Sequence, residues 1–544
     1  MVHRTVVTVL LVLSALLLAS VGALIVVQPR HASQTPVTHA TPRPGAPLTS
    51  QSQAEVTIAP GARPLRIPDS FLGLSTEYWA VPEWDRESAV LDRVLTLLHA
   101  PGDGPLMLRI GGDSANEALW ESEAGEFPEW IVELTPSWLG PTGALVRHTG
   151  VRLVLDLNVV TASPQISAQW AGAAEAALPH GSVAGFEIGN EPDLYSRNYW
   201  IKVVAQTIAA SQLLPDSLSP AAYAADFGQY ADAVAAVAPG VPLLGPAVAS
   251  PVRGPRWISA LLASPHSGLR AVTAHQYPYS ACARPASPRY PTIARLLAEP
   301  ATAGMAKALE PGIRLAVHAG LRFRLTELNS VTCGGRPGVS DTFATALWAP
   351  DALFELLRAG VNAVNVHVRP GTSNAAFSLS RHGLSANPLL YGLLLFARTV
   401  GHDSEFVPLH VAAGHGLALK AWAVRLRSGA LHVVLINKGG RTATVDLRLS
   451  GLGPGSVYRM RAPSVSSRWG VTLGGRHLSV SGRWLGIAAS EVVLRSDSGY
   501  TVTLPRFSAA LFEAPRASPR SSQLLRHDRI HRPQLGADRR PVRA

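Results

Sequence analysis

From about residue 70 to residue 400, short apolar runs alternate with stretches rich in alanine and leucine. This alternation is typical of βα units around a parallel sheet. Stretches such as Leu91–His99, Tyr223–Val237 and Thr342–Ala359 favour helix through their alanine and leucine content. Eight candidate strands lie between such stretches: Phe71–Tyr78, Leu106–Gly112, Arg152–Asn158, Ala184–Asn190, Pro242–Ala247, Ala271–Tyr277, Phe323–Asn329 and Ala363–Val368.

Eight such units in succession predict a closed (β/α)8 TIM barrel over residues 70–402, with an open doubly wound sheet as the alternative. The remainder of the 544 residues leaves room for a second domain. After residue 403 the runs become short and partly alternating, with glycine-containing turns, which predicts a β-sandwich over 403–515. Within the segment 54–69, Ala54–Ile58 could add a strand to that sandwich.

The amino terminus has the pattern of an export segment. His3 and Arg4 precede an apolar run from Val6 to Val27, followed by Arg30. This predicts either a cleaved signal peptide or a single membrane anchor over residues 1–30, because the run is also long enough to span a bilayer. Residues 31–53 are rich in Ser, Thr and Pro and read as a linker. We therefore expect a protein that is secreted or anchored outside the cytoplasm.

The net charge of +11 is concentrated at the carboxyl terminus. The segment 516–544 holds eight arginines and two aspartates, which gives +6 of the total, and it has no apolar period. We interpret it as a solvated basic tail and expect no nucleic-acid partner. Attraction to a wall polysaccharide or to lipid headgroups is the alternative.

Polar residues stand at or near the end of seven of the eight candidate strands. In a barrel, catalytic groups lie at the carboxyl ends of the strands, because packed side chains fill the interior. Packing alone explains one or two such residues, but not seven. The seven polar strand-end groups are Glu77, Arg109, Asn158, Asn190–Glu191, His275–Tyr277, Glu327–Asn329 and His367.

Two glutamates at these ends suit a glycosidase. Glu191 follows the fourth strand within Gly-Asn-Glu-Pro, and Glu327 ends the seventh. Retaining hydrolysis needs a carboxylic acid and a carboxylate nucleophile about 5–5.5 Å apart. We predict Glu191 as general acid/base, its pKa raised by the charge of Glu327, and Glu327 as nucleophile. Asn190 could bind a neighbouring sugar hydroxyl, and Tyr277 could orient the nucleophile.

These motifs resemble the clan A retaining glycoside hydrolases and, within the clan, family 79, which contains β-glucuronidases and heparanase. The matching stretches span about residues 70–330. They are Phe71-Leu-Gly-Leu-Ser-Thr-Glu77-Tyr78, Leu108-Arg109-Ile-Gly-Gly-Asp-Ser114, Phe186-Glu-Ile-Gly-Asn190-Glu191-Pro192-Asp193, His275-Gln-Tyr277 and Thr326-Glu327-Leu-Asn-Ser330.

The resemblance implies an exo-acting β-glucuronidase whose substrate is a glycan or glycoconjugate containing glucuronic acid. It implies the same roles for Glu191 and Glu327. It also implies that Gly334, after the nucleophile, offers a backbone N–H to the sugar carboxylate, whereas Gly334 and Gly335 could merely form a turn. By the same resemblance, Glu77, Asn158, Asn190 and Tyr277 would line the sugar site, with Arg109 and His275 as supporting residues.

The two cysteines of the chain follow two of these strands. Cys333 lies in the loop after the nucleophile, and Cys282 follows the His275–Tyr277 strand end. Because both strand ends face one mouth, we expect a Cys282–Cys333 disulfide between two substrate loops, as export would permit.

The sequence has no glycine-rich nucleotide loop after a strand and no Cys or His cluster at zinc spacing, so we expect no cofactor and no metal. Two other functions stay open. One is a clan A β-glycosidase for a neutral sugar, such as a β-glucosidase or β-xylosidase. The other is a surface-anchored, non-catalytic carbohydrate-binding protein.

Overall fold

The computed structural model describes residues 52–61, 63–100, 102–120, 131–195, 218–264 and 268–517. The predicted signal or anchor (1–30), nearly all of the linker and almost all of the basic tail lie outside these residues. Within the described ranges, no helix combines the length and the apolarity needed to cross a bilayer.

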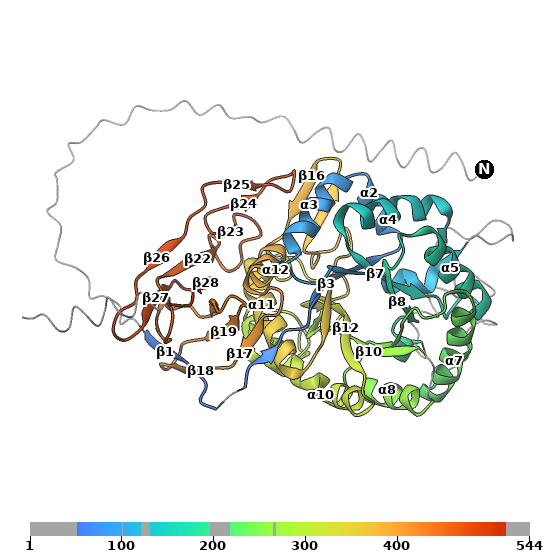
Figure 1. Ribbon diagram of the computed structural model, residues 1–544, viewed down its shortest axis with the longest axis horizontal. Helices are drawn as coiled ribbons and strands as arrows, with labels where there is room; N and C mark the ends of the chain where they lie inside the picture. Colours follow the sequence, from blue (N-terminus) through green and yellow to red (C-terminus); the bar gives the residue numbers. More distant parts are fainter. Residues whose placement is uncertain are drawn as a thin grey trace, which may run out of the picture. The chain divides into compact units, whose positions relative to one another are not determined.

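Eight parallel strands close into a barrel (Figure 1), which confirms the predicted fold class. Closure depends on the pairing of the last strand with the first, where Val364 lies opposite Leu72, and an open sheet would lack that pairing. In the order of their pairing, the strands are β10 (Leu269–Gln276), β12 (Arg322–Leu328), β14 (Ala363–His367), β3 (Leu72–Glu77), β4 (Met107–Gly111), β7 (Arg152–Leu157), β8 (Val183–Ile188) and β9 (Leu243–Val248).

Helices lie between the strands, as the alanine- and leucine-rich stretches predict. Proline in the first turn and serine N-caps begin several of them; Ser163 and Ser219, for example, accept hydrogen bonds from Ile166 N–H and Ala222 N–H. The helices of the barrel are α2 (Ala80–Asp85), α3 (Ser88–Leu98), α4 (Pro136–Thr149), α5 (Pro164–Ala177), α7 (Pro220–Val237), α8 (Gly254–Ala263), α9 (Ile293–Leu297), α10 (Ala303–His318), α11 (Phe343–Ala359) and α12 (Pro388–Thr399), with short 3-10 turns η1 (Gly112–Glu117), η2 (Pro192–Leu194) and η4 (Glu299–Ala301).

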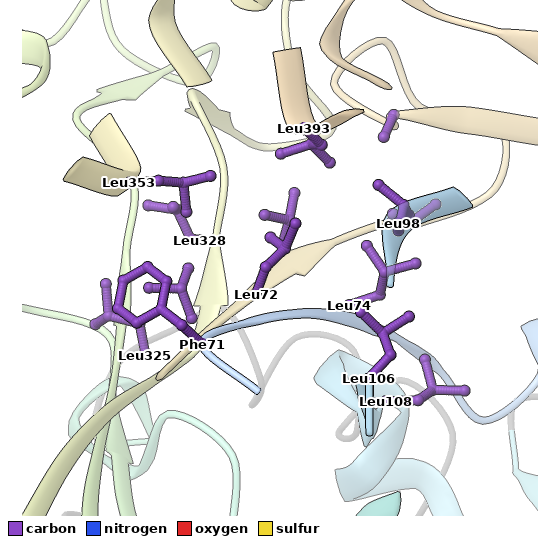
Figure 2. Packing of buried hydrophobic residues seen from close by; sticks show 14 of the residues in the cluster. Phe71, Leu72, Leu74, Leu98, Leu106, Leu108, Leu325, Leu328, Leu353 and Leu393 are labelled. Carbon is purple, nitrogen blue, oxygen red and sulfur yellow. The ribbon is translucent and has the colours of Figure 1, made fainter. Parts of the chain in front are cut away.

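The two faces of β3 show how the strands divide between core and site. Leu72 and Leu74 pack with leucines of α3, α11 and α12 in the layer between strands and helices (Figure 2). Successive side chains of a strand point to opposite faces. Ser75 and Glu77 therefore point into the barrel, where they contact residues of the candidate site.

Short two-stranded sheets form within the loops of the barrel. These elements are β5 (Ala118–Trp120) with β6 (Val132–Leu134), β11 (Tyr279–Ser280) with β13 (Val331–Thr332), and the hairpin β15 (Phe377–Ser380) with β16 (Gly383–Ala386). β11 follows β10 and β13 follows β12, so this pair joins two loops at the carboxyl ends of neighbouring barrel strands.

Two sheets form the carboxyl-terminal sandwich, as predicted. β1 (Ser52–Ile58) pairs parallel with β21 and antiparallel with β18, so the first described strand belongs to this domain. One sheet has the order β18 (Leu409–Ala413), β1, β21 (Ala443–Arg448), β27 (Tyr500–Leu504). The other has the order β2 (Leu65–Arg66), β17 (Glu405–Val407), β19 (Leu419–Arg425), β20 (Leu431–Asn437), β28 (Ser508–Ala514), β22 (Gly455–Arg461), β23 (Thr472–Leu473), with β26 (Glu491–Val493) beside β22; β24 (His477–Leu478) pairs with β25 (Trp484–Leu485).

The sandwich packs directly on the barrel. Phe354 of α11 stacks on Trp422 of β19 at 5.6 Å between ring centres. The indole N–H of Trp422 donates to Asp351, whose carboxylate also pairs with the buried Lys438. Because the apolar contacts and the ion pair are both buried, the two domains share one continuous core here.

Candidate active site

Glu191 lies in a tight turn after β8. Its φ is 53°, a left-handed conformation that costs a residue other than glycine of order 1–3 kcal/mol. Asp193 holds the turn, because its carboxylate accepts from Ala249 N–H at 2.8 Å and Ser250 N–H at 3.1 Å. The chain thus keeps a strained backbone at the residue predicted as general acid/base.

Glu327 is the penultimate residue of β12, and its side chain lies in the barrel mouth. Arg109 Nη1 donates to its Oε1 at 2.6 Å, and the Tyr277 hydroxyl donates to its Oε2 at 2.7 Å. Both carboxylate oxygens are therefore held by donors, which fixes the orientation of the group and favours its ionised form.

The two glutamates meet across the mouth through His275. Its Nδ1 lies 2.9 Å from Glu191 Oε1 and 3.8 Å from Glu327 Oε2. The nitrogen and one oxygen of each carboxylate all lie within 4.8 Å of one another. This separation fits a retaining pair of carboxyl groups, whereas inverting pairs stand about 6.5–9.5 Å apart.

The surroundings of the two carboxyls push their pKa values apart. Burial, together with the negative charge of Glu327, raises the pKa of Glu191, although the hydrogen bond with His275 opposes the rise. Burial alone would also raise the pKa of Glu327, but the charges of His275, His367 and Arg109 and the Tyr277 hydrogen bond hold it well below its usual range. One carboxyl is thus suited to hold a proton and the other to stay ionised.

Arg109 is fully buried and ties four strands together. Besides Glu327, its guanidinium donates to Glu187 of β8 at 2.9 Å, Asp156 of β7 at 2.5 Å and Asn190 at 2.9 Å. Asp156 and Glu187 were missed by the sequence reasoning. The signal was present, because each is a lone acid inside an apolar strand, where an unpaired charge would be costly.

Asn190 and Asn158 differ in their availability to a ligand. The Asn190 carbonyl accepts from Arg109, and its Nδ2 has no hydrogen-bond partner among the described residues, so it can donate to a sugar. The amide of Asn158 is used in full: it donates to Ala118 O and the Thr161 hydroxyl and accepts from Val160 N–H and Thr161 N–H. The predicted sugar contact of Asn158 is therefore corrected to a structural role in the turn after β7.

Glu77 begins a charged cluster on the β3 side of the mouth. It accepts from Ser114 N–H at 2.9 Å and lies 3.3 Å from Arg369, which also pairs with Asp113 at 2.8 Å. Burial and the charge of Glu77 raise the pKa of Asp113 to about 7, and the pKa of Glu117 rises to about 7 for the same two reasons. Glu77 and His367 were expected at the mouth from the sequence, whereas Asp113, Glu117 and Arg369 were not.

The loop after Glu327 contains the predicted disulfide. Cys282 and Cys333 are bonded, with 6.0 Å between their Cα atoms. Gly334 has a φ of 74°, and its N–H has no hydrogen-bond partner in the described chain. At Gly335 a Cβ would lie 2.7 Å from Asn374 N, so that position requires glycine for its turn. The N–H of Gly334 thus stays a candidate hydrogen-bond donor to an anion, while Gly335 has a structural role in the turn.

We expect the Cys282→Ser/Cys333→Ser double variant to lose about 2–4 kcal/mol of unfolding free energy, because the bond closes a loop of 51 residues. Urea denaturation measures the loss. Dithiothreitol should lower the wild type to the level of the variant and leave the variant unchanged. Equal stability of the oxidised wild type and the variant would contradict the prediction.

Glu191, His275 and Glu327 also offer three atoms at a spacing that could hold a metal ion. Arg109 already supplies Glu327 with a positive charge at 2.6 Å, so a divalent cation would meet a carboxylate that is compensated. The hydrogen-bonded arrangement can act as a proton donor and a nucleophile by itself.

No protein-family model matches the chain, and no curated protein matches it either. Among the solved structures that are similar to it, three that match over 85% of its length illustrate the range. A 4-O-α-L-rhamnosyl-β-D-glucuronidase from Fusarium oxysporum has a TM-score of 0.68, 20% identity and 99% of its own chain covered. A GH51 arabinofuranosidase from Xanthomonas axonopodis pv. citri has a TM-score of 0.61 and 15% identity, and 100% of its own chain is covered. A GH family 44 endoglucanase from Clostridium thermocellum has a TM-score of 0.55 and 14% identity, and 100% of its own chain is covered.

These likenesses extend over both the barrel and the sandwich, because almost the whole of each compared chain is covered. At 14–20% identity they establish shared architecture. They support the expected clan A fold but not family 79 specifically. The chain has the fold of the clan A glycoside hydrolases.

Proposed function

We propose that this protein is a retaining β-glycoside hydrolase that works by double displacement. The observation that carries the proposal is the pair Glu191 and Glu327, with carboxylate oxygens within 4.8 Å and pKa values shifted in opposite directions. Glu327 attacks the anomeric carbon while Glu191 protonates the leaving oxygen. With the charge of Glu327 consumed in the glycosyl–enzyme bond, Glu191 releases its proton more readily and activates water.

More narrowly, we propose an exo-acting β-glucuronidase. Two observations support this: the free N–H of Gly334 beside the nucleophile strand, and the likeness to an enzyme described as a rhamnosyl-glucuronidase. A second candidate is a glycosidase for a neutral sugar. Asp113 and Glu117, whose pKa values rise to about 7, are protonated below neutral pH and can then donate to uncharged sugar hydroxyls, whereas above it they would repel a sugar carboxylate on their side of the mouth. The arabinofuranosidase and endoglucanase likenesses agree with that second candidate.

Aryl β-D-glucuronide, β-D-glucoside and β-D-xyloside separate the candidates, with Glu327→Gln as the inactive control. Hydrolysis of the glucuronide alone supports the narrow proposal. Activity on a neutral sugar alone keeps the two-glutamate mechanism and overturns the glucuronidase assignment. A well-folded protein that hydrolyses none of the three, nor polymeric substrates, would be a carbohydrate-binding protein.

We expect kcat/KM on an aryl glycoside to fall as the pH rises through the raised pKa of Glu191, because the ionised acid cannot protonate the leaving oxygen. On the acid side, activity should persist below the usual glutamate pKa, because Glu327 stays ionised there. A 2,4-dinitrophenyl leaving group, which needs no proton, should remove the alkaline fall. An acid limb at or above pH ~4.3, the usual pKa of glutamate, would contradict the assignment of Glu327.

We further propose that the protein acts outside the cytoplasm, secreted or held by an N-terminal anchor. The disulfide supports this, because such bonds persist in oxidising compartments. The apolar run from Val6 to Val27 supports it as well. Recovery of the full chain in a cytoplasmic fraction with both thiols reduced would overturn it.

A further inference from the structure

Trp469 is a large, exposed aromatic residue on a loop that the sandwich extends onto the barrel. The loop, residues 463–470, lies between β22 and β23. Its backbone is anchored to α11, since Val465 O accepts from Ala344 N–H at 3.0 Å and Ser467 O accepts from Phe343 N–H at 2.8 Å. Trp469 is nevertheless 75% exposed.

An ion pair fixes the loop a third time. Arg468 Nε lies 2.7 Å from Asp341, just before α11 begins at Phe343. The same guanidinium lies 5.9 Å from the centre of the Trp469 ring. Trp469 therefore directly follows Arg468, which forms an ion pair with Asp341 of the barrel. It lies at the end of a loop whose backbone is hydrogen-bonded to α11.

The anchoring point lies on the catalytic face. α11 is the helix that follows β12, the strand whose penultimate residue is Glu327. In a barrel such a helix begins at the carboxyl ends of the strands. The loop between Glu327 and α11 is also the disulfide-bonded loop of Cys333 and Gly334. Trp469 is thus joined to the rim of the mouth on its β12 side.

A second excursion of the sandwich reaches the neighbouring rim. Val480 O accepts from Leu384 N–H at 2.6 Å, and Leu384 belongs to the β15–β16 hairpin that follows β14. Ser481 O accepts from Arg93 of α3 at 2.6 Å. Figure 1 shows β24 and β25 near β16 and α3. The sandwich therefore borders the mouth beside both β12 and β14.

Single exposed apolar residues are ordinary on protein surfaces, so exposure alone assigns nothing to Trp469. What distinguishes it is a flat ring, on a loop held by backbone bonds, at the rim of a site proposed to bind sugars. Pairs of aromatic rings gain about 0.5–1.5 kcal/mol beyond simple burial when they stack. We take a contribution of the same size for an indole face on the apolar face of a pyranose ring.

We propose that Trp469 is a sugar-binding platform for the part of the substrate beyond the cleaved bond, so that the sandwich completes the substrate site. This rests on the proposed function and deepens it: the enzyme prefers an oligosaccharide aglycone to a small aryl group. No rearrangement of the loop is required for binding, because the indole is already exposed.

The test compares kcat/KM for a hyaluronan-derived hexasaccharide with β-glucuronic acid at its non-reducing end and for an aryl β-D-glucuronide. In Trp469→Ala, the ratio of the two values should fall about 5- to 10-fold, the size of one lost aromatic stacking contact. Trp469→Phe should restore most of the ratio. Ile487→Ala, which removes a similarly exposed apolar side chain of the same domain, should leave both values unchanged.

A ratio in Trp469→Ala that stays within twofold of the wild type overturns the platform, even if both substrates are cleaved. If neither glucuronide is cleaved, the proposed function fails by itself, and the platform is judged by calorimetric titration with hexasaccharides of hyaluronan, xylan and β-1,4-glucan. Binding that weakens at least fivefold in Trp469→Ala for one of them supports the platform. Binding that is equal in wild type and variant, or absent for all three, overturns it.

Discussion

Glu327→Ala should reduce kcat/KM on an activated aryl glycoside by about 10⁴-fold or more, the range of loss seen when a covalent nucleophile is removed. The cavity left by the side chain lies next to Arg109 and Tyr277, two donors that hold the wild-type carboxylate. Azide can therefore enter in its place and attack the anomeric carbon on the face opposite the leaving group. We expect azide to restore turnover and to yield the α-glycosyl azide from a β-glycoside.

Glu191→Ala should lose about 10²- to 10⁴-fold, the contribution of general acid–base catalysis. Its azide product should be the β-glycosyl azide, because azide then attacks the glycosyl–enzyme formed on Glu327. Glu83→Ala, an exposed glutamate of α2, should change nothing. Opposite product configurations in the two variants, read by NMR, assign the roles. The reversed pattern would exchange them, and an α-azide from both variants would contradict the covalent mechanism.

Arg109→Met should be the most destabilising single substitution in the site. It leaves the buried carboxyls of Asp156, Glu187 and Glu327 without their shared donor. Removing one partner of a buried ion pair costs about 3–5 kcal/mol. Urea denaturation at neutral pH measures the loss, with Arg322→Met, an exposed arginine at the start of β12, as the matched control.

The pH dependence of that loss provides a second readout. Burial already raises the pKa of Asp156 well above its usual range, and the Arg109 charge opposes that rise. Without the guanidinium, ionising the buried carboxyls opposes folding more strongly. The deficit should be full above the raised pKa values and should shrink as the pH falls through them, because protonated carboxyls need no counter-charge. Arg109→Lys should keep part of the stability, since it retains the charge but not the planar fork. A loss below about 1 kcal/mol that does not vary with pH would contradict this account.

Much of the fold follows from local pattern. Each barrel strand is a short apolar run between helical stretches, and a repeat of eight such units leaves few arrangements other than closure. Glu191 and Glu327 could be named for a related reason, because each stands at or just after the end of an apolar run, Glu191 within the turn sequence Gly-Asn-Glu-Pro. The pairing of Cys282 with Cys333 followed from the neighbourhood of two strand ends.

Other features depend on contacts between distant residues. Asn158 has the residue type and the position of a sugar ligand, but its hydrogen bonds to Ala118, Val160 and Thr161 use the whole amide. No feature of the strand it follows reveals that the β5 segment comes close. The acids Asp113 and Glu117 were likewise missed, because their raised pKa values arise from burial beside Glu77.

The sequence by itself determined the barrel, the sandwich, the disulfide and the two candidate catalytic glutamates, because each depends on residue type and spacing along the chain. The sequence also predicted a different role for each glutamate, but only the tertiary structure decided which groups shift their pKa values. Arg109, Tyr277, His275 and His367 come from several different strands or strand ends, and their charges and hydrogen bonds lower the pKa of Glu327 while burial raises that of Glu191. Electrostatic energy depends on distance in space and on burial, and neither is written in the order of the residues.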